Sequence, residues 1–264
     1  SIAGGDGNDS ILLTVGVTAS TIDAGGGNDT ISLTTGTYSG NFLQGGAGND
    51  TLVFAGTLTN STLYGGSTSA TSLDGDDSIS IAGSISNVII NGNGGNDILA
   101  LSSVLGGSVV QGGQGGDFIT VSQSLVSSTV SGNLGNDTIA FLATSNISGS
   151  TVYGGGSNDT SLDGADSIVI GGSLVNAFVQ ANGGNDVINL AGVLVQGSSV
   201  YGGQGNDSIL AANASKQYLT STLQGNLGSD QISLGSTNAI ISSSIYGGDA
   251  TGTLTGNDSI TIGA

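Results

Sequence analysis

The sequence predicts an all-β protein, a parallel β-solenoid of about 12 coils with roughly 20 residues per coil. Three observations lead to this fold class. A Gly-rich turn ending in Asp recurs along the chain, apolar and polar residues alternate after each Asp, and Gly makes up 50 of the 264 residues while Pro is absent. Alternation is the period of a strand with one buried face, and frequent Gly disfavours helix. Two short strands cannot bury their apolar faces alone, so successive coils must stack.

An aspartate marks each coil, and the spacing of these aspartates reveals a longer period. Successive spacings are 20, 21, 27, 20, 20, 20, 29, 20, 21, 23 and 28 residues, so a long spacing closes each group of four coils. We therefore expect one repeat array, 1–264, made of three super-repeats at approximately 1–87, 88–176 and 177–264. The marking residues are Asp9, Asp29, Asp50, Asp77, Asp97, Asp117, Asp137, Asp166, Asp186, Asp207, Asp230 and Asp258.

Two strands are expected in each coil. The first follows the Asp, and its inward positions are nearly always apolar, as are Ile31 and Leu33 after Asp29. The second precedes the glycines and has one inward apolar column, which includes Leu43. A turn rich in Ser, Thr and Gly joins the strands on one side, and the Asp-bearing turn joins them on the other. Twelve such coils at about 4.8 Å each would form a rod about 55–60 Å long.

The composition excludes most chemistry. All 19 acidic residues are Asp, there is one Lys and no His or Cys, and the formal net charge is −18. Without imidazole or thiol groups the usual bases, nucleophiles and zinc ligands are missing, so we expect no enzymatic activity. A surface this acidic repels nucleic acid and is expected to bind cations. No disulfide can form, and no apolar run approaches the length of a membrane span.

The Gly-rich turn carries the chemistry. It reads Gly-Gly-Asp-Gly-Asn-Asp at 4–9, Gly-Gly-Ala-Gly-Asn-Asp at 45–50 and Gly-Gly-Gln-Gly-Asn-Asp at 202–207. This resembles the Gly-Gly-x-Gly-x-Asp-x-U-x nonapeptide of the RTX (repeats-in-toxin) calcium-binding β-roll family, in which U is a large apolar residue, and the resemblance extends over the whole chain. It implies Ca²⁺ as the cofactor, held by turn carbonyls and by the twelve marking aspartates. Electrostatics agree, because carboxylates stacked about 5 Å apart repel by about 1 kcal/mol per pair even in water.

The chain departs from the family pattern in three ways. The motif comes once per coil rather than every nine residues, so only one edge of the solenoid should bind calcium. Four turns have Asn at the second position, and Asn tolerates a left-handed backbone nearly as well as Gly does. The long turns at 65–77, 154–166 and 247–258 contain insertions whose role the sequence leaves open. Candidate extra ligands there are Asp74 or Asp76 and Asp159 or Asp163, but the third turn has only Asp249 and Asp258, which argues against a dedicated second site.

Other interpretations of these residues stay open. Each marking Asp can instead bond its own turn backbone without metal, and the Asn that precedes eight of the twelve suggests a side-chain ladder. Outward tyrosines before Gly-Gly suggest a stacked surface row or a glycan-binding row: Tyr64, Tyr153, Tyr201 and Tyr246. The outward positions of the first strand do not form the regular Thr array that would suit ice. They suggest a face that packs against another chain, through Leu12, Val53, Ile98, Phe118, Val169 and Val187.

From these features we expect a calcium-stabilised extracellular structural repeat protein of a bacterial cell surface, in a surface layer, sheath or filament. Its expected partners are calcium ions, other copies or other surface proteins, and cell-surface glycans. One alternative is the ligand-binding or stalk section of a large RTX-type adhesin; another is the calcium-binding C-terminal portion of a secreted enzyme. The RTX resemblance implies export into millimolar calcium. Both ends fall within a coil, so we expect a section of a longer repeat protein.

Overall fold

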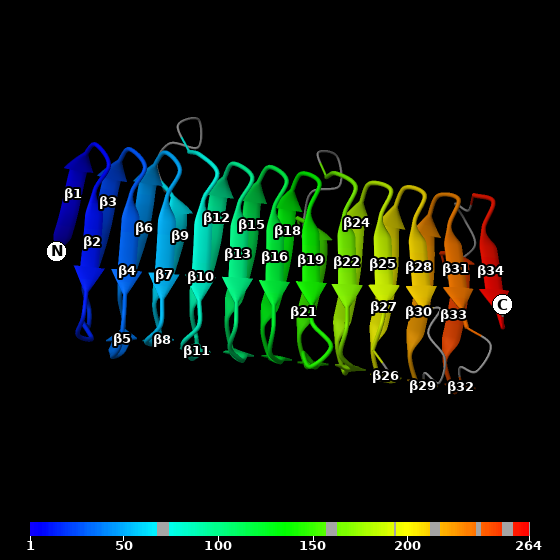
Figure 1. Ribbon diagram of the computed structural model, residues 1–264. Coiled ribbons are helices and arrows are strands. Elements are labelled where there is room, and N and C mark those ends of the chain that lie inside the picture. The colour runs from blue at the N-terminus through cyan, green and yellow to red at the C-terminus, as the bar shows by residue number, and fades with distance from the viewer. Residues whose placement is uncertain are drawn as a thin grey trace.

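The computed structural model describes the chain except for residues 68–73, 157–162, 193, 212–216, 236–238, 250–255 and 264. The described residues form a rod of stacked coils, with every strand parallel to its neighbours (Figure 1). This confirms the parallel β-solenoid. In the described part of the chain no helix is long and apolar enough to cross a membrane.

Three sheets run along the rod, two of twelve strands and one of ten. Sheet A comprises β1 (Ile2–Asp6), β3 (Thr21–Gly26), β6 (Phe42–Ala47), β9 (Thr62–Gly66), β12 (Ile89–Gly94), β15 (Val109–Gln114), β18 (Thr129–Leu134), β21 (Thr151–Gly155), β24 (Phe178–Gly183), β27 (Ser199–Gln204), β30 (Thr222–Leu227) and β33 (Ser244–Gly248). Sheet B comprises β2 (Ser10–Leu13), β4 (Thr30–Leu33), β7 (Thr51–Phe54), β10 (Ser78–Ile81), β13 (Ile98–Leu101), β16 (Phe118–Val121), β19 (Thr138–Phe141), β22 (Ser167–Ile170), β25 (Val187–Leu190), β28 (Ser208–Ala211), β31 (Gln231–Leu234) and β34 (Ser259–Ile262). Sheet C comprises β5 (Thr37–Ser39), β8 (Thr57–Thr59), β11 (Ile85–Ser86), β14 (Leu105–Gly106), β17 (Leu125–Val126), β20 (Ile147–Ser148), β23 (Leu174–Val175), β26 (Leu194–Gln196), β29 (Gln217–Leu219) and β32 (Ala239–Ile241).

Sheet C corrects the prediction of two strands per coil. Its strands lie in what the sequence suggested was a plain turn rich in Ser, Thr and Gly. Each has only two or three residues, which is too short for alternation to be visible. In nine of the ten strands, all but β32, one side chain still points inward and is buried, as Leu105, Leu125 and Ile147 are, so these strands close the core at its far end.

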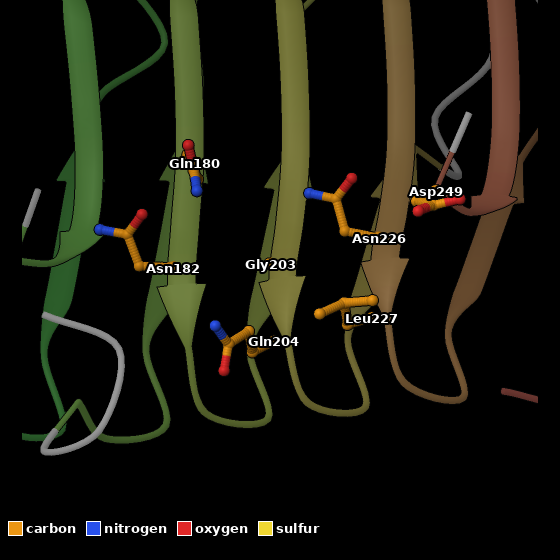
Figure 2. Close-up of a pocket in the computed structure, with 7 residues that line it drawn as sticks. All are labelled: Gln180, Asn182, Gly203, Gln204, Asn226, Leu227 and Asp249. Carbon is orange, nitrogen blue, oxygen red and sulfur yellow. The ribbon is translucent and has the colours of Figure 1, made fainter. Parts of the chain in front are cut away.

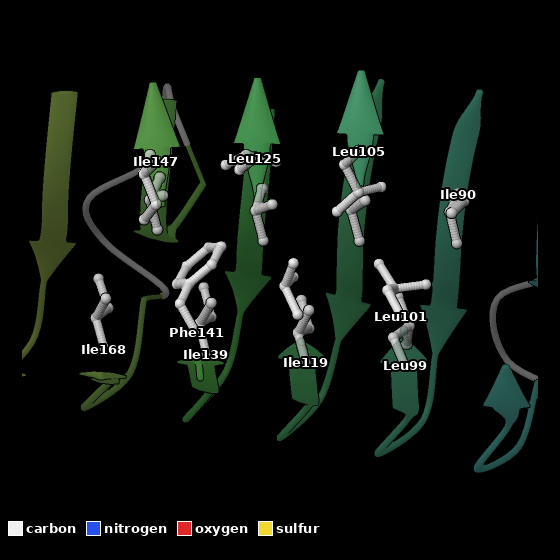
Figure 3. Close-up of a cluster of buried hydrophobic side chains, with 14 of the residues drawn as sticks. Ile90, Leu99, Leu101, Leu105, Ile119, Leu125, Ile139, Phe141, Ile147 and Ile168 are labelled. Atoms are coloured by element: carbon white, nitrogen blue, oxygen red, sulfur yellow. The ribbon is translucent and has the colours of Figure 1, made fainter. Parts of the chain in front are cut away.

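The core consists of columns of equivalent residues from successive coils. In sheet B, Leu99 pairs with Ile119 and Ile119 with Ile139, and all three are fully buried. Figure 3 shows this row beside the row that sheet C contributes. Parallel pairing in register places each inward residue on its counterpart, which is how coils that are individually too small bury their apolar faces.

A serine ladder fills the corner between sheets C and A. The hydroxyl of Ser128 accepts a hydrogen bond from the backbone N of Ser108 in the preceding coil (2.9 Å) and donates one to the carbonyl of Val126 (2.8 Å). Most coils repeat this arrangement with buried side chains at the same position. These are Asn41, Ser61, Ser108, Ser128, Ser150, Ser198 and Ser221. Here the buried polar atoms find partners within the protein.

Candidate metal sites along the glycine-rich edge

The marking aspartates line one long edge of the rod. Each lies where the turn from sheet A enters sheet B, and these turns stack along the upper edge in Figure 1. The carboxylates of the ten inner coils are 1–3% exposed, and only Asp9 and Asp258, in the first and last coils, are less buried. Stacking the turns therefore removes a continuous column of carboxylates from water. We call this column the aspartate ladder.

One carboxylate oxygen of every ladder residue from Asp29 to Asp258 has a defined partner. Oδ1 of Asp117 accepts a hydrogen bond from the backbone N of Asp97 in the preceding coil (2.8 Å), and Oδ1 of Asp137 does the same for Asp117 (2.7 Å). The bond recurs at every step from Asp9 to Asp258, at 2.7–3.0 Å. The alternative interpretation, in which each Asp bonds its own turn backbone, is thus wrong in its partner, because the bond crosses to the neighbouring coil.

The second carboxylate oxygen has no partner within the protein. Oδ2 is buried without a hydrogen bond in eleven ladder residues, from Asp9 to Asp230. This oxygen lies against the first Gly of the turn: a Cβ built on Gly112 would collide with Oδ2 of Asp117 and with the carbonyl oxygen of Gly132 in the next coil. Carboxylate and carbonyl oxygens of adjacent coils therefore converge beside each first Gly.

Burial raises the pKa of the nine ladder carboxyl groups from Asp50 to Asp230. The pKa of Asp77 is raised to about 9 and that of Asp97 to about 8, mainly by burial and in smaller part by neighbouring aspartates. Backbone N–H groups of the preceding coil lower these pKa values but do not offset burial. A buried anion with an unsatisfied oxygen is unfavourable unless a cation pairs with it. With one Lys against 19 Asp, the sequence cannot supply that cation.

The residues present fit calcium. Ca²⁺ takes six to eight oxygen ligands from carboxylates and carbonyls. In the described residues no three His, Cys, Asp or Glu side chains gather into one group, so each site would combine ladder Oδ2 atoms with turn carbonyls. The absence of nitrogen and sulfur ligands disfavours zinc and copper.

The turn backbone needs a left-handed conformation at two positions. In the turn at 45–50, φ is +116° at Gly46 and +115° at Gly48. Where Asn replaces the first of these, as at Asn93 and Asn226, φ is +81° and +80°, and the same sheet A register continues. Asn therefore keeps the left-handed backbone of these turns, in agreement with its tolerance of that conformation.

The long turns bring further carboxylates to the same edge. Oδ2 of Asp74 accepts a hydrogen bond from the backbone N of Gly94 (3.0 Å), and Asp163 accepts the equivalent bond from Gly183 (3.2 Å). Oδ1 of Asp74 is buried without a hydrogen bond, whereas Asp76 bonds the exposed Asn96. Asp159 lies outside the described residues. Asp74 and Asp163 are therefore better placed as extra ligands than Asp76.

The Asn that precedes most ladder residues forms an outer ladder, as predicted. Oδ1 of Asn8 accepts a hydrogen bond from the backbone N of Asn28 (2.8 Å), and Oδ1 of Asn28 accepts one from Asn49 (3.0 Å). These bonds are solvent-exposed, and they fix the same turns whose inner oxygens stay unsatisfied. Asn here is a turn former, and the candidate ligand is the Asp.

Three of the four outward tyrosines, Tyr64, Tyr153 and Tyr201, lie against phenylalanines that sequence reasoning did not single out. The rings of Tyr153 and Phe178 lie 5.9 Å apart and those of Phe178 and Tyr201 lie 5.5 Å apart, both edge to face. Phe42 and Tyr64 form a similar pair at 5.6 Å. The alternation of the sequence could have indicated these ring pairs, because each Phe is in an outward position of the neighbouring strand of sheet A.

A shallow pocket of about 330 Å³ lies next to this row on sheet A, and sequence analysis missed it. Figure 2 shows its origin: Gly203 lacks a side chain between the amides of Asn182 and Asn226 on the two neighbouring strands. Gln180, Gln204, Leu227 and Asp249 complete the lining. Amide groups therefore dominate the pocket.

Comparison with known proteins agrees with this geometry. The model of the RTX calcium-binding nonapeptide repeat (4 copies) matches residues 16–38, 35–53 and 198–213. A crystal structure of a hyperactive, Ca²⁺-dependent, β-helical antifreeze protein from an Antarctic bacterium matches with a TM-score of 0.69 and 26% identity, over 88% of this chain and 66% of that one. This chain thus covers just under two thirds of that protein's length. No curated protein matches the sequence.

Proposed function

We propose that this chain, a calcium-binding β-helical protein with RTX nonapeptide repeats, serves as a rigid structural element outside the cell, in a bacterial surface layer, sheath or filament. In this proposal the ladder aspartates bind the calcium, and residues 1–264 act as one array of three super-repeats. The observation that carries the proposal is the contrast between two ladders. The serine ladder satisfies its polar atoms internally, whereas the aspartate ladder leaves Oδ2 of eleven buried carboxylates for a cation.

Calcium dependence favours a location outside the cell. Free ligand stabilises a folded state appreciably only where its concentration approaches or exceeds the dissociation constant, and each occupied site adds to the total. A rod held by about one ion per coil would therefore be stable in millimolar calcium and unstable in a calcium-poor interior. The repeated outer surface and the missing His and Cys favour scaffolding over catalysis.

Small-angle X-ray scattering with calcium and with chelator tests this proposal. With calcium we expect a rod about 55–60 Å long, from twelve coils at about 4.8 Å each. With chelator we expect the expanded scattering of an unfolded chain. Magnesium, which prefers a tight octahedral shell, serves as the control cation and should not restore the rod. A rod of the same length in chelator would contradict the proposal.

A ligand-binding section of an adhesin is the second candidate, and the amide-lined pocket beside the tyrosine row favours it. Amides donate and accept hydrogen bonds to hydroxyl groups, and exposed aromatic rings pack on the apolar faces of sugars. A glycan array probed with the calcium-loaded chain tests it, with Asn226→Ala as the pocket variant and Asn93→Ala as its matched control. A ligand lost only in Asn226→Ala would favour the adhesin over the scaffold.

Ice binding is a third candidate function, because the matching structure is that of an antifreeze protein. The outward columns of sheet B mix Ser and Thr with Leu12, Ile98 and Phe118, so no uniform Thr array covers this face. We therefore favour the structural role over ice binding. Thermal hysteresis measured on the calcium-loaded chain distinguishes the two.

A further inference from the structure

We infer that the outer face of sheet B is a self-association surface, on which a second copy of this chain packs face to face. The inference deepens the proposed structural role, on which it rests, by assigning the lateral contact between rods. It starts from the side chains that sheet B turns away from the core.

The outer face of sheet B carries no charge. Its twelve strands are described in full and turn 24 side chains outward, all of them Ser, Thr, Asn, Gln or apolar residues. Several large apolar side chains are exposed among them: Leu12 is 60% exposed, Ile98 51% and Phe118 47%, with Val53 and Val187 near 40%. A sequence with 19 acidic residues thus keeps one complete face neutral and partly apolar. Such faces are typical of interaction sites.

The negative charge lies elsewhere. In the described residues the aspartates occupy the Gly-rich turns and their flanks, and Asp23 lies on sheet A. Two chains of net charge −18 repel one another through most approaches. Contact through sheet B leaves the charged edge at the rim of the interface rather than within it, and calcium on that edge lowers the remaining repulsion. Electrostatics therefore favour this face for contact between like molecules.

The size of the face suits a stable dimer. Twelve strands at about 4.8 Å, each with four residues at about 3.3 Å, make a surface of about 760 Å² per copy. Two copies would then bury about 1,500 Å², which lies within the range of specific protein–protein interfaces.

A second copy fits this face better than an unrelated partner. Sheets pack face to face about 10 Å apart with their strand directions nearly aligned, so the partner must present an equally long sheet. Another copy supplies a sheet of the same length, the same strand spacing and the same neutral surface. The contact is isologous, since each copy uses the same residues.

Sedimentation velocity in millimolar calcium tests the inference with four lysine variants. Ile98→Lys and Phe118→Lys place a charge on the outer face of sheet B. Ile89→Lys and Val126→Lys are matched controls, since each replaces an apolar residue that is 42% exposed, on sheet A and sheet C respectively. Far-UV circular dichroism in the same buffer checks that every variant keeps its strand content.

We expect the unmodified chain and both controls to sediment as dimers. Ile98→Lys and Phe118→Lys should raise the dissociation constant by about 30-fold or more, because each buries an unpaired charge in the interface. A monomeric unmodified chain, or equal loss of dimer in the controls, would overturn the inference. The inference would also be overturned if a monomeric chain showed thermal hysteresis and Phe118→Lys abolished that hysteresis. This result would make the outer face of sheet B an ice-binding face. Calcium-dependent strand formation in a monomer would refute only this inference; strand content indifferent to chelator would refute the proposed function instead.

Discussion

Replacing one ladder carboxylate by its amide should change stability in opposite directions with and without calcium. Asp117→Asn keeps the shape of the side chain and the Oδ1 atom that accepts from Asp97 N, but it removes the charge at the buried Oδ2. Burial raises the pKa of Asp117 from 3.8 to about 6. At about 1.4 kcal/mol per pKa unit, the ionised carboxylate destabilises the calcium-free fold by about 3 kcal/mol. The amide should therefore stabilise the calcium-free solenoid by about 2–3 kcal/mol.

With calcium the sign reverses. An ion present at about 1,000 times its dissociation constant contributes about 4.1 kcal/mol to the unmodified chain. The variant loses this contribution but keeps its gain of about 2–3 kcal/mol, so in excess calcium it should be about 1–2 kcal/mol less stable than the unmodified chain. The assay is urea unfolding followed by far-UV circular dichroism, in excess calcium and in chelator, with trimethylamine N-oxide added to both so that the calcium-free state is folded at the outset.

Ser128→Ala is the control for this prediction. It leaves the backbone N of Ser108 without its acceptor and should lower the unfolding free energy by about 1–3 kcal/mol, whether or not calcium is present. If Asp117→Asn instead destabilised the chain equally in calcium and in chelator, the carboxylate would act only through its hydrogen bond. The reasoning that makes it a calcium ligand would then be refuted.

Three further predictions follow from the same structure. Because the carboxyl pKa values are raised, the calcium-free fold is most stable below pH 3.8 and loses stability as the pH rises through about 6 to 9. A pH titration in chelator, monitored by circular dichroism, should therefore show strand at acidic pH and coil at pH 8. Strand at both pH values would contradict this prediction. Gly112→Ala should lower the calcium stoichiometry measured by calorimetry, because its Cβ collides with Asp117 and with the Gly132 carbonyl; an unchanged stoichiometry would place the ion elsewhere. Phe141→Ala leaves a cavity in the core and should lower the unfolding free energy in calcium by about 3–5 kcal/mol, measured by urea unfolding. The number of calcium ions bound at saturation should not change. A smaller loss of unfolding free energy would mean that the core collapses around the cavity.

Much of the fold could be predicted because the structural repeat of about 20 residues is visible as a repeat in the sequence. Alternation fixed the inward columns, such as Leu99 with Leu101 and Ile119 with Val121, all fully buried. The spacing of the aspartates predicted both their stacking and their common edge. Repetition strengthens such signals, since each coil confirms the register of its neighbour.

Other features could not be predicted, for physical reasons. A sheet C strand such as β14 has two residues, so its single inward Leu105 shows no alternation. The bond from Asp97 N to Oδ1 of Asp117 depends on how adjacent coils are offset, and no pattern within one coil specifies that offset. The pocket at Gly203 depends on which side chains of three neighbouring strands face outward together.

The most direct test of calcium as the partner of the aspartate ladder is a calcium titration of the chain from chelator. Far-UV circular dichroism follows strand formation, and calorimetry counts the ions. We predict a cooperative transition from coil to strand near millimolar calcium, with close to one ion for each of the eleven buried Oδ2 atoms. A strand spectrum already complete in chelator, with no calcium bound, would contradict this assignment and leave the aspartates as turn formers only.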